Sequence, residues 1–195
     1  MFEKFYQKEP PKDPITLLAE QHKTDIEKIK KLKCHYASKI EMILMLLGEK
    51  PASTFALTSK DDSAETIAKT LRDAGLKVAI ETKEEKYHSL IIARDQSSID
   101  KIQALHQIQR KKDEVYQEQY GELVGYPKTA TAAFAGKIPS MGEKESWKLD
   151  PTLIYSIIYS KDHWQEEIKL MRKWTETIKK YAPDLYEEAL KKRNM

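Results

Sequence analysis

The stretch of the sequence best suited to chemistry is rich in glycine and small residues and lies between residues 121 and 136. Gly125-Tyr126-Pro127 is followed there by a run of Ala and Thr that ends at Gly136. A proline at such a point is typical of a helix start. The free N–H groups and the dipole at a helix start favour an anion or a carboxylate. The pattern therefore predicts a site for a small anionic ligand, with contacts from Gly125, Tyr126, Pro127, Lys128, Thr129 and Thr131.

Two other interpretations of this stretch remain open. The first is purely structural: a tight turn and a small helix that packs against a sheet, with Ala side chains and Phe134 as filling. The second is an enzyme in which Tyr126, Lys128 and Glu122 act with Asp162 and His163, two residues that follow a predicted strand. This enzyme hypothesis requires Tyr126 and His163 to lie close together, because acid–base catalysis works over hydrogen-bond distances.

Known catalytic and metal-binding patterns are missing from the sequence. No two of its five histidines have the spacing of metal ligands, and Cys34 is its one cysteine. There is no Walker loop, no Gly-x-Gly-x-x-Gly and no Gly-x-Ser-x-Gly. We therefore expect no metal and no cofactor. A non-catalytic module that binds a small ligand or a protein is the favoured hypothesis.

Composition limits the remaining classes of protein. The chain has 195 residues, of which 40% are hydrophobic and 33% charged, which is typical of a folded protein and not of a disordered one. The 34 basic and 31 acidic residues are well mixed, which argues against nucleic-acid binding; weak, nonspecific contact through Lys-rich helix faces is the alternative. The longest apolar run, Met42 to Leu47, is far too short to span a membrane. We expect a cytoplasmic protein with no membrane partner.

Gly125, Tyr126 and Pro127, with Phe134 a few residues later, form a pattern that resembles an uncharacterised protein family. Members of that family carry a Gly-Tyr-Pro-Glu-Cys-Cys signature followed by Phe. In this chain Lys128, Thr129 and Ala130 replace the Glu and the two Cys. A second similarity is the segment 160–164, Ser-Lys-Asp-His-Trp, before a long helix. The resemblance covers the C-terminal part of the chain and implies a shared shape only.

Helices are predicted at both ends of the chain. Asp13-Pro14 is typical of a helix start, and the capping-box pattern of residues 38–41 predicts a second helix up to Gly48; one unbroken helix over 14–47 is the alternative. Another helix is expected to begin near Asp62-Ser63 and to end at Gly75. The later predictions are a long helix from Ser97 or Ser98, a short one from Pro127 to Gly136, a loop over 137–150, and a long C-terminal helix ending at Pro183 with one or two further turns.

Four strands are predicted between the helices: Thr54 to Ser59, Leu76 to Thr82, Tyr87 to Ala93 and Leu153 to Tyr159. The second alternates apolar and polar residues, and with the third it predicts a hairpin. The fourth is apolar on both faces, which is typical of a central strand.

This order of elements predicts an α+β fold. We expect a four-stranded, mostly antiparallel sheet of the ferredoxin-like split β-α-β order from about residue 54, with helices mainly on one face. Residues 1–13 are predicted to be a loose lead-in to a single domain over 14–195. Within that domain we expect a helical part over 14–50, a sheet-containing core over 53–160 and C-terminal helices over 161–192.

Overall fold

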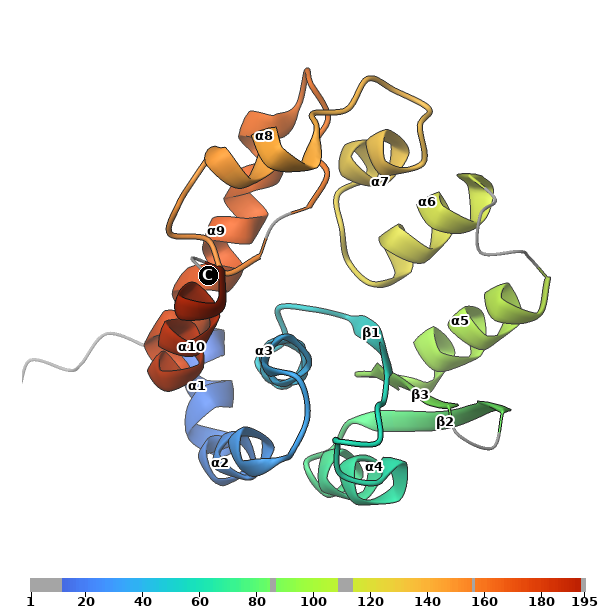
Figure 1. Ribbon diagram of the computed structural model, residues 1–195. Helices are drawn as coiled ribbons and strands as arrows, with labels where there is room; N and C mark the ends of the chain where they lie inside the picture. The colour runs from blue at the N-terminus through green and yellow to red at the C-terminus, as the bar shows by residue number, and fades with distance from the viewer. Residues whose placement is uncertain (1–11, 85–86, 109–113, 156, 194–195) are drawn as a thin grey trace, which may run out of the picture.

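Helices make up most of the structure, a computed structural model that describes residues 12–84, 87–108, 114–155 and 157–193. The described part contains ten helices and three strands (Figure 1). In chain order these are α1 (Pro14–Gln21), α2 (Lys23–Lys31), α3 (Tyr36–Leu46), β1 (Ala52–Ala56), α4 (Ala64–Asp73), β2 (Lys77–Glu84), β3 (Tyr87–Ala93), α5 (Gln96–Ile108), α6 (Glu114–Leu123), α7 (Lys128–Phe134), α8 (Glu143–Lys148), α9 (Trp164–Tyr181) and α10 (Pro183–Arg193). The predicted lead-in, residues 1–13, lies outside the described residues except for its last two.

The N-terminal part is three helices and not one or two. Asp13 caps α1 by accepting a hydrogen bond from the Thr16 N–H at 3.0 Å, as the sequence predicts. The chain leaves helical geometry at His22, and it does so again after α2. The N-cap of α3 is His35, so Ser38 lies inside that helix and the predicted capping box is wrong. Glu41 instead accepts a hydrogen bond from the Ser53 hydroxyl.

The sheet has the strand order β1-β3-β2, and both pairs are antiparallel. The predicted β2–β3 hairpin is confirmed. Alternate residues of the central strand β3 point to opposite faces: Leu90 and Ile92 join the larger core with α4, while Ile91 packs with Ile99 and Ile102 of α5. The sheet is therefore covered on both faces, and the expectation of helices mainly on one face is wrong.

The predicted four-stranded, ferredoxin-like sheet is also wrong, because residues 153–159, outside residue 156, form no strand. Leu153, Ile154 and Tyr159 are buried, but they belong to the core around α9. The Ile154 N–H donates to the Thr175 hydroxyl of α9, and the end of the segment is joined to other backbone by the isolated bridge between Ser140 and Ser160. An apolar run predicts burial, and it cannot distinguish burial in a sheet from burial against a helix.

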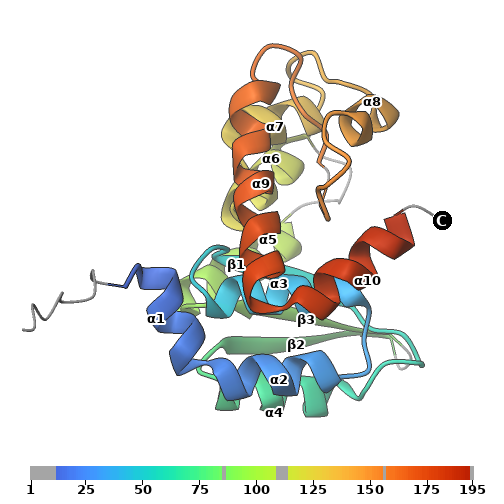
Figure 2. The same ribbon diagram turned by 90° about the vertical axis from the view of Figure 1, so that its left-hand side faces the viewer.

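The C-terminal half differs from prediction in two more places. Residues 137–150 contain the short helix α8, where the sequence predicts a loop, and α10 is a full helix of eleven residues. Figure 2 shows α6, α7 and α9 on one side of the level of the sheet, with α2 and α4 on the other. Among the helices that the structure describes, none is long and apolar enough to cross a membrane.

Candidate functional site

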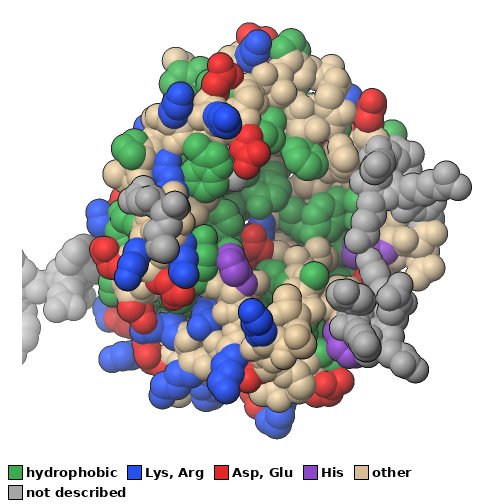
Figure 3. Space-filling view, viewed as in Figure 1, with side chains coloured by type: hydrophobic (Ala, Val, Ile, Leu, Met, Phe, Trp, Pro, Cys, Tyr) green, Lys and Arg blue, Asp and Glu red, His purple; other side chains and the backbone are tan. Residues whose placement is uncertain are grey.

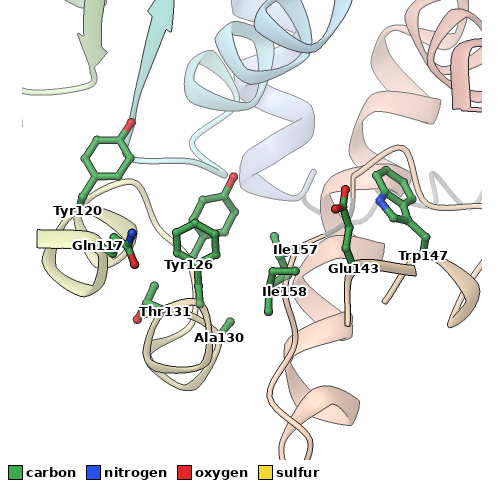
Figure 4. Close-up of a pocket in the computed structure, with 11 residues that line it drawn as sticks. Gln117, Tyr120, Tyr126, Ala130, Thr131, Glu143, Trp147, Ile157 and Ile158 are labelled. Atoms are coloured by element: carbon green, nitrogen blue, oxygen red, sulfur yellow. The ribbon is translucent and has the colours of Figure 1, made fainter. Parts of the chain in front are cut away.

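A pocket of about 480 Å³ opens between α6 and α7 on one side and α8 on the other. In Figure 4, Tyr126, Ala130 and Thr131 stand opposite Glu143 and Trp147, with two isoleucines between them. Figure 3 shows a hollow in the face of the molecule that carries these helices, with hydrophobic side chains gathered around it. The lining residues are mainly aromatic and aliphatic: Gln117, Tyr120, Gly121, Tyr126, Ala130, Thr131, Phe134, Glu143, Trp147, Ile157 and Ile158.

Two glycines bring α6 and α7 together to form one wall. A Cβ atom on Gly121 would lie 2.3 Å from Cγ2 of Thr131, so the close approach of the two helices requires glycine there. Gly125 has a φ of +92°, and a Cβ on it would lie 2.5 Å from Cδ of Pro51. The turn between α6 and α7 is therefore held against the segment that leads into β1.

Tyr126 directly follows this turn, and its ring separates the pocket from the buried interior. The ring centre lies 5.8 Å from that of Trp174 in α9, and 4.3 Å from the Lys50 ammonium nitrogen. Burial raises the pKa of the Tyr126 hydroxyl well above its usual value, and the Glu41 carboxylate acts in the same direction. Tyr126 therefore stays neutral at physiological pH.

Lys50 is a fully buried cation behind this wall, with an exposed fraction of 1%. Its ammonium group donates a hydrogen bond to the Val124 carbonyl at 2.9 Å and lies 4.8 Å from the Trp174 ring centre. Burial lowers the pKa of Lys50, and the charge of Glu41 opposes that shift. The sequence around Lys50, Gly-Glu-Lys-Pro, is equally typical of an exposed turn, so no local pattern predicts that this lysine is buried.

Tyr120 supplies a second aromatic wall from α6. Its hydroxyl is hydrogen-bonded to the Thr54 hydroxyl of β1, and burial raises its pKa to about 12. Its ring is parallel to that of Tyr116, at 5.9 Å between centres, and both stack on His106 of α5. These contacts fix the orientation of the Tyr120 ring.

Gln117 and Glu143 are lining side chains whose polar groups are available to a ligand. Gln117 is half-buried and Glu143 is exposed. Within the described part of the chain, neither the Gln117 amide nor the Glu143 carboxylate has a hydrogen-bond or ion-pair partner. The Thr131 hydroxyl, by contrast, donates to the Lys128 carbonyl of its own helix.

The opposite wall is held in place by residues far along the chain. Arg193, at the end of α10, donates hydrogen bonds to the Trp147, Asp150 and Leu153 carbonyls, and its guanidinium group lies 4.7 Å from the Trp147 ring centre. The segment with Ile157 and Ile158 is fixed at its end by a second set of bonds. The Ser160 N–H and hydroxyl both donate to the buried Glu167 carboxylate, at 2.9 and 2.7 Å.

The structure brings only some of the predicted site residues together. Tyr126 and Thr131 line the pocket; Gly125 shapes the turn, and Pro127 is the N-cap of α7. Thr129 and Lys128 do not line it, and the Lys128 side chain, 83% exposed, pairs with Glu122 at 3.6 Å.

The catalytic grouping of the enzyme hypothesis does not assemble around this pocket. Asp162 and His163 are exposed and are not among its lining residues. Sequence reasoning missed Gln117, Trp147 and the pair Ile157–Ile158, because no local pattern links these distant segments.

Comparison with known proteins adds nothing to this geometry. No family model matches the chain, and neither a curated protein nor a solved structure matches it. The resemblance to the Gly-Tyr-Pro family stays a prediction, and the function has to be argued from the pocket itself.

Proposed function

We propose that the protein binds a small, flat and mainly apolar molecule in the pocket between α6, α7 and α8. The observation that supports this most is the composition of the walls, where aromatic and aliphatic side chains from four separate segments enclose about 480 Å³. That volume lies within the range of small-molecule sites, which are mostly apolar with a few polar groups that orient the ligand. Gln117 and Glu143 are those polar groups here.

The charge of the walls distinguishes this proposal from the anion site that the sequence suggests. Among the described residues that line the pocket, none is lysine or arginine, and Glu143 is acidic. A ligand that is neutral in its buried part therefore fits best, because a buried unpaired charge is costly.

The test is a titration with an uncharged, flat probe, for which indole is suitable. An apolar fragment of this size in such a pocket is expected to bind with a dissociation constant of about 1 mM. Ligand-observed NMR (saturation transfer) measures binding in that range. The Ala130→Met variant fills the pocket from α7, and we expect it to weaken indole binding at least tenfold.

Ala132→Met is the matched control, since Ala132 lies on the same helix but does not line the pocket. It should bind indole as the wild type does, and thermal unfolding should show that both variants are folded. Equal binding of indole by the two variants, or no binding by the wild type, would contradict the proposal.

A further inference from the structure

We propose that the ligand is a nucleobase or a nucleoside, stacked on the aromatic walls and read by the amide of Gln117. This inference rests on the proposed function, because it names the class of molecule that the same pocket takes. Three observations support it: the amide of Gln117, the cations behind two aromatic rings, and the charge of the opposite wall.

The Gln117 amide is the first observation. It is half-buried, it makes no hydrogen bond to any residue that the structure describes, and Figure 4 shows it on the side of the pocket that holds Tyr120 and Thr131. A glutamine amide offers one acceptor beside two donors in a single plane. It can therefore pair in a bidentate way with a flat ring that carries a donor next to an acceptor, as adenine does.

The aromatic walls are the second observation. Tyr126 has the Lys50 ammonium 4.3 Å from its ring centre, and Trp147 has the Arg193 guanidinium at 4.7 Å. Neither cation lines the pocket, so both act on the rings from outside it. A cation on one side draws the ring's electron density toward itself. The side facing the pocket then suits an electron-rich ring, and purine bases are such rings and stack on aromatic side chains regardless of sequence.

The charge of the opposite wall separates nucleosides from nucleotides. A nucleotide needs basic groups or free N–H groups for its phosphate, and no lysine or arginine lines the pocket within the described residues. The exposed Glu143 would repel a phosphate, but its carboxylate can accept hydrogen bonds from the hydroxyls of a ribose. We therefore expect a nucleoside to bind better than its monophosphate.

The experiment compares three probes by isothermal titration calorimetry or NMR: adenosine, purine riboside and adenosine monophosphate. Purine riboside has the same shape as adenosine but lacks the exocyclic amine. Bidentate pairing discriminates by about 5- to 150-fold, so adenosine should bind at least fivefold more tightly than purine riboside. The monophosphate should bind no more tightly than adenosine.

Gln117→Met should remove this preference by weakening adenosine more than purine riboside, so that the two bind within twofold of each other. Gln119→Met is the matched control on the exposed side of α6, and it should keep the wild-type ratio. Glu143→Gln should keep the ratio too and should strengthen binding of the monophosphate.

The outcomes distinguish this inference from the proposed function. If indole binds but adenosine shows no preference over purine riboside, or if Gln117→Met keeps the preference, the nucleobase inference is overturned and the apolar pocket stands. If the monophosphate binds more tightly than adenosine, the preference for nucleosides is overturned. If neither indole nor adenosine binds, both proposals fail.

Discussion

Replacement of Gly125 by alanine tests the contact that fixes the pocket wall. Gly125 and Gly75 have the same φ of +92°, so a side chain suffers the same backbone strain at both positions. They differ in space: a Cβ on Gly75 meets nothing within 4 Å, whereas a Cβ on Gly125 would lie 2.5 Å from Cδ of Pro51. Gly75→Ala is therefore a control that isolates the backbone term.

The two terms can be estimated separately. Left-handed backbone costs a residue with a Cβ about 1–2 kcal/mol, and this is the whole loss expected for Gly75→Ala. The overlap with Pro51 adds about 1–3 kcal/mol, the usual cost of overpacking. Gly125→Ala should thus lower the free energy of unfolding by about 2–5 kcal/mol. For a chain of this size that is a fall in Tm of about 4–20 °C, against about 2–8 °C for Gly75→Ala.

Urea unfolding followed by circular dichroism measures both losses by linear extrapolation. A double-mutant cycle with Pro51→Ala then isolates the overlap, because that change removes the Cδ atom. We expect Gly125→Ala to cost less in the Pro51→Ala background than in the wild type. If Gly125→Ala and Gly75→Ala cost the same, or if the cycle shows no coupling, the contact between the turn and Pro51 does not hold the wall as argued.

Three further predictions follow from buried polar groups. Burial raises the pKa of the Cys34 thiol to about 11. At pH 8 a disulfide reagent such as dithionitrobenzoate should therefore modify this thiol roughly 100-fold more slowly in the folded protein than in urea, because only the thiolate reacts. Equal rates would contradict the burial of Cys34. Burial lowers the pKa of Lys50 below its ordinary value of 10.5. Just below pH 10.5 the unfolded chain therefore binds more protons than the folded one, and the free energy of unfolding should rise with pH. Lys50→Met should lack this rise in urea titrations from pH 8 to 10. Glu167→Ala leaves the buried N–H and hydroxyl of Ser160 without an acceptor and should cost about 3 kcal/mol by urea unfolding, whereas the exposed neighbour Glu166→Ala should cost under about 1 kcal/mol.

The parts of the fold that the sequence predicts correctly depend on residues a few positions apart. Ser63 caps α4 through the Thr66 N–H, and Gly75 ends the turn after that helix with a positive φ. The β2–β3 hairpin follows from alternation within two adjacent segments. In each case the side chain and the backbone group it satisfies lie within one turn or one hairpin, so the physical cause is visible in the sequence.

The errors arise where tertiary contacts decide. Ser38 has the pattern of a capping residue, but the helix begins earlier because His35 leaves helical geometry and accepts a hydrogen bond from the Ala37 N–H. Residues 153–159 have the composition of a central strand. A fourth strand would have to pair with an edge of the sheet, and this segment does not lie there. It packs on α9, through contacts such as that of Ile154 with Thr175.

The pocket as a whole could not be predicted, because it too depends on tertiary contacts. Part of one wall could, since the predicted site residues Tyr126 and Thr131 line it. Tyr126 and Thr131 stand in a stretch whose glycines, proline and small residues indicate a tight helical turn. The aromatic rings that line the pocket are contacted by groups from elsewhere in the chain: Tyr126 by Lys50, and Trp147 by Arg193. Both are basic residues, which usually lie at a solvated surface. Here each lies against an aromatic ring and also donates to backbone carbonyls, Lys50 to that of Val124 and Arg193 to those of Asp150 and Leu153. Each ring is held by its contact with a side chain that is itself anchored by hydrogen bonds to the backbone. The contacts that position the aromatic walls thus come from distant parts of the chain, and the Gln117 amide and the Glu143 carboxylate, which have no partner among the described residues, contribute selectivity.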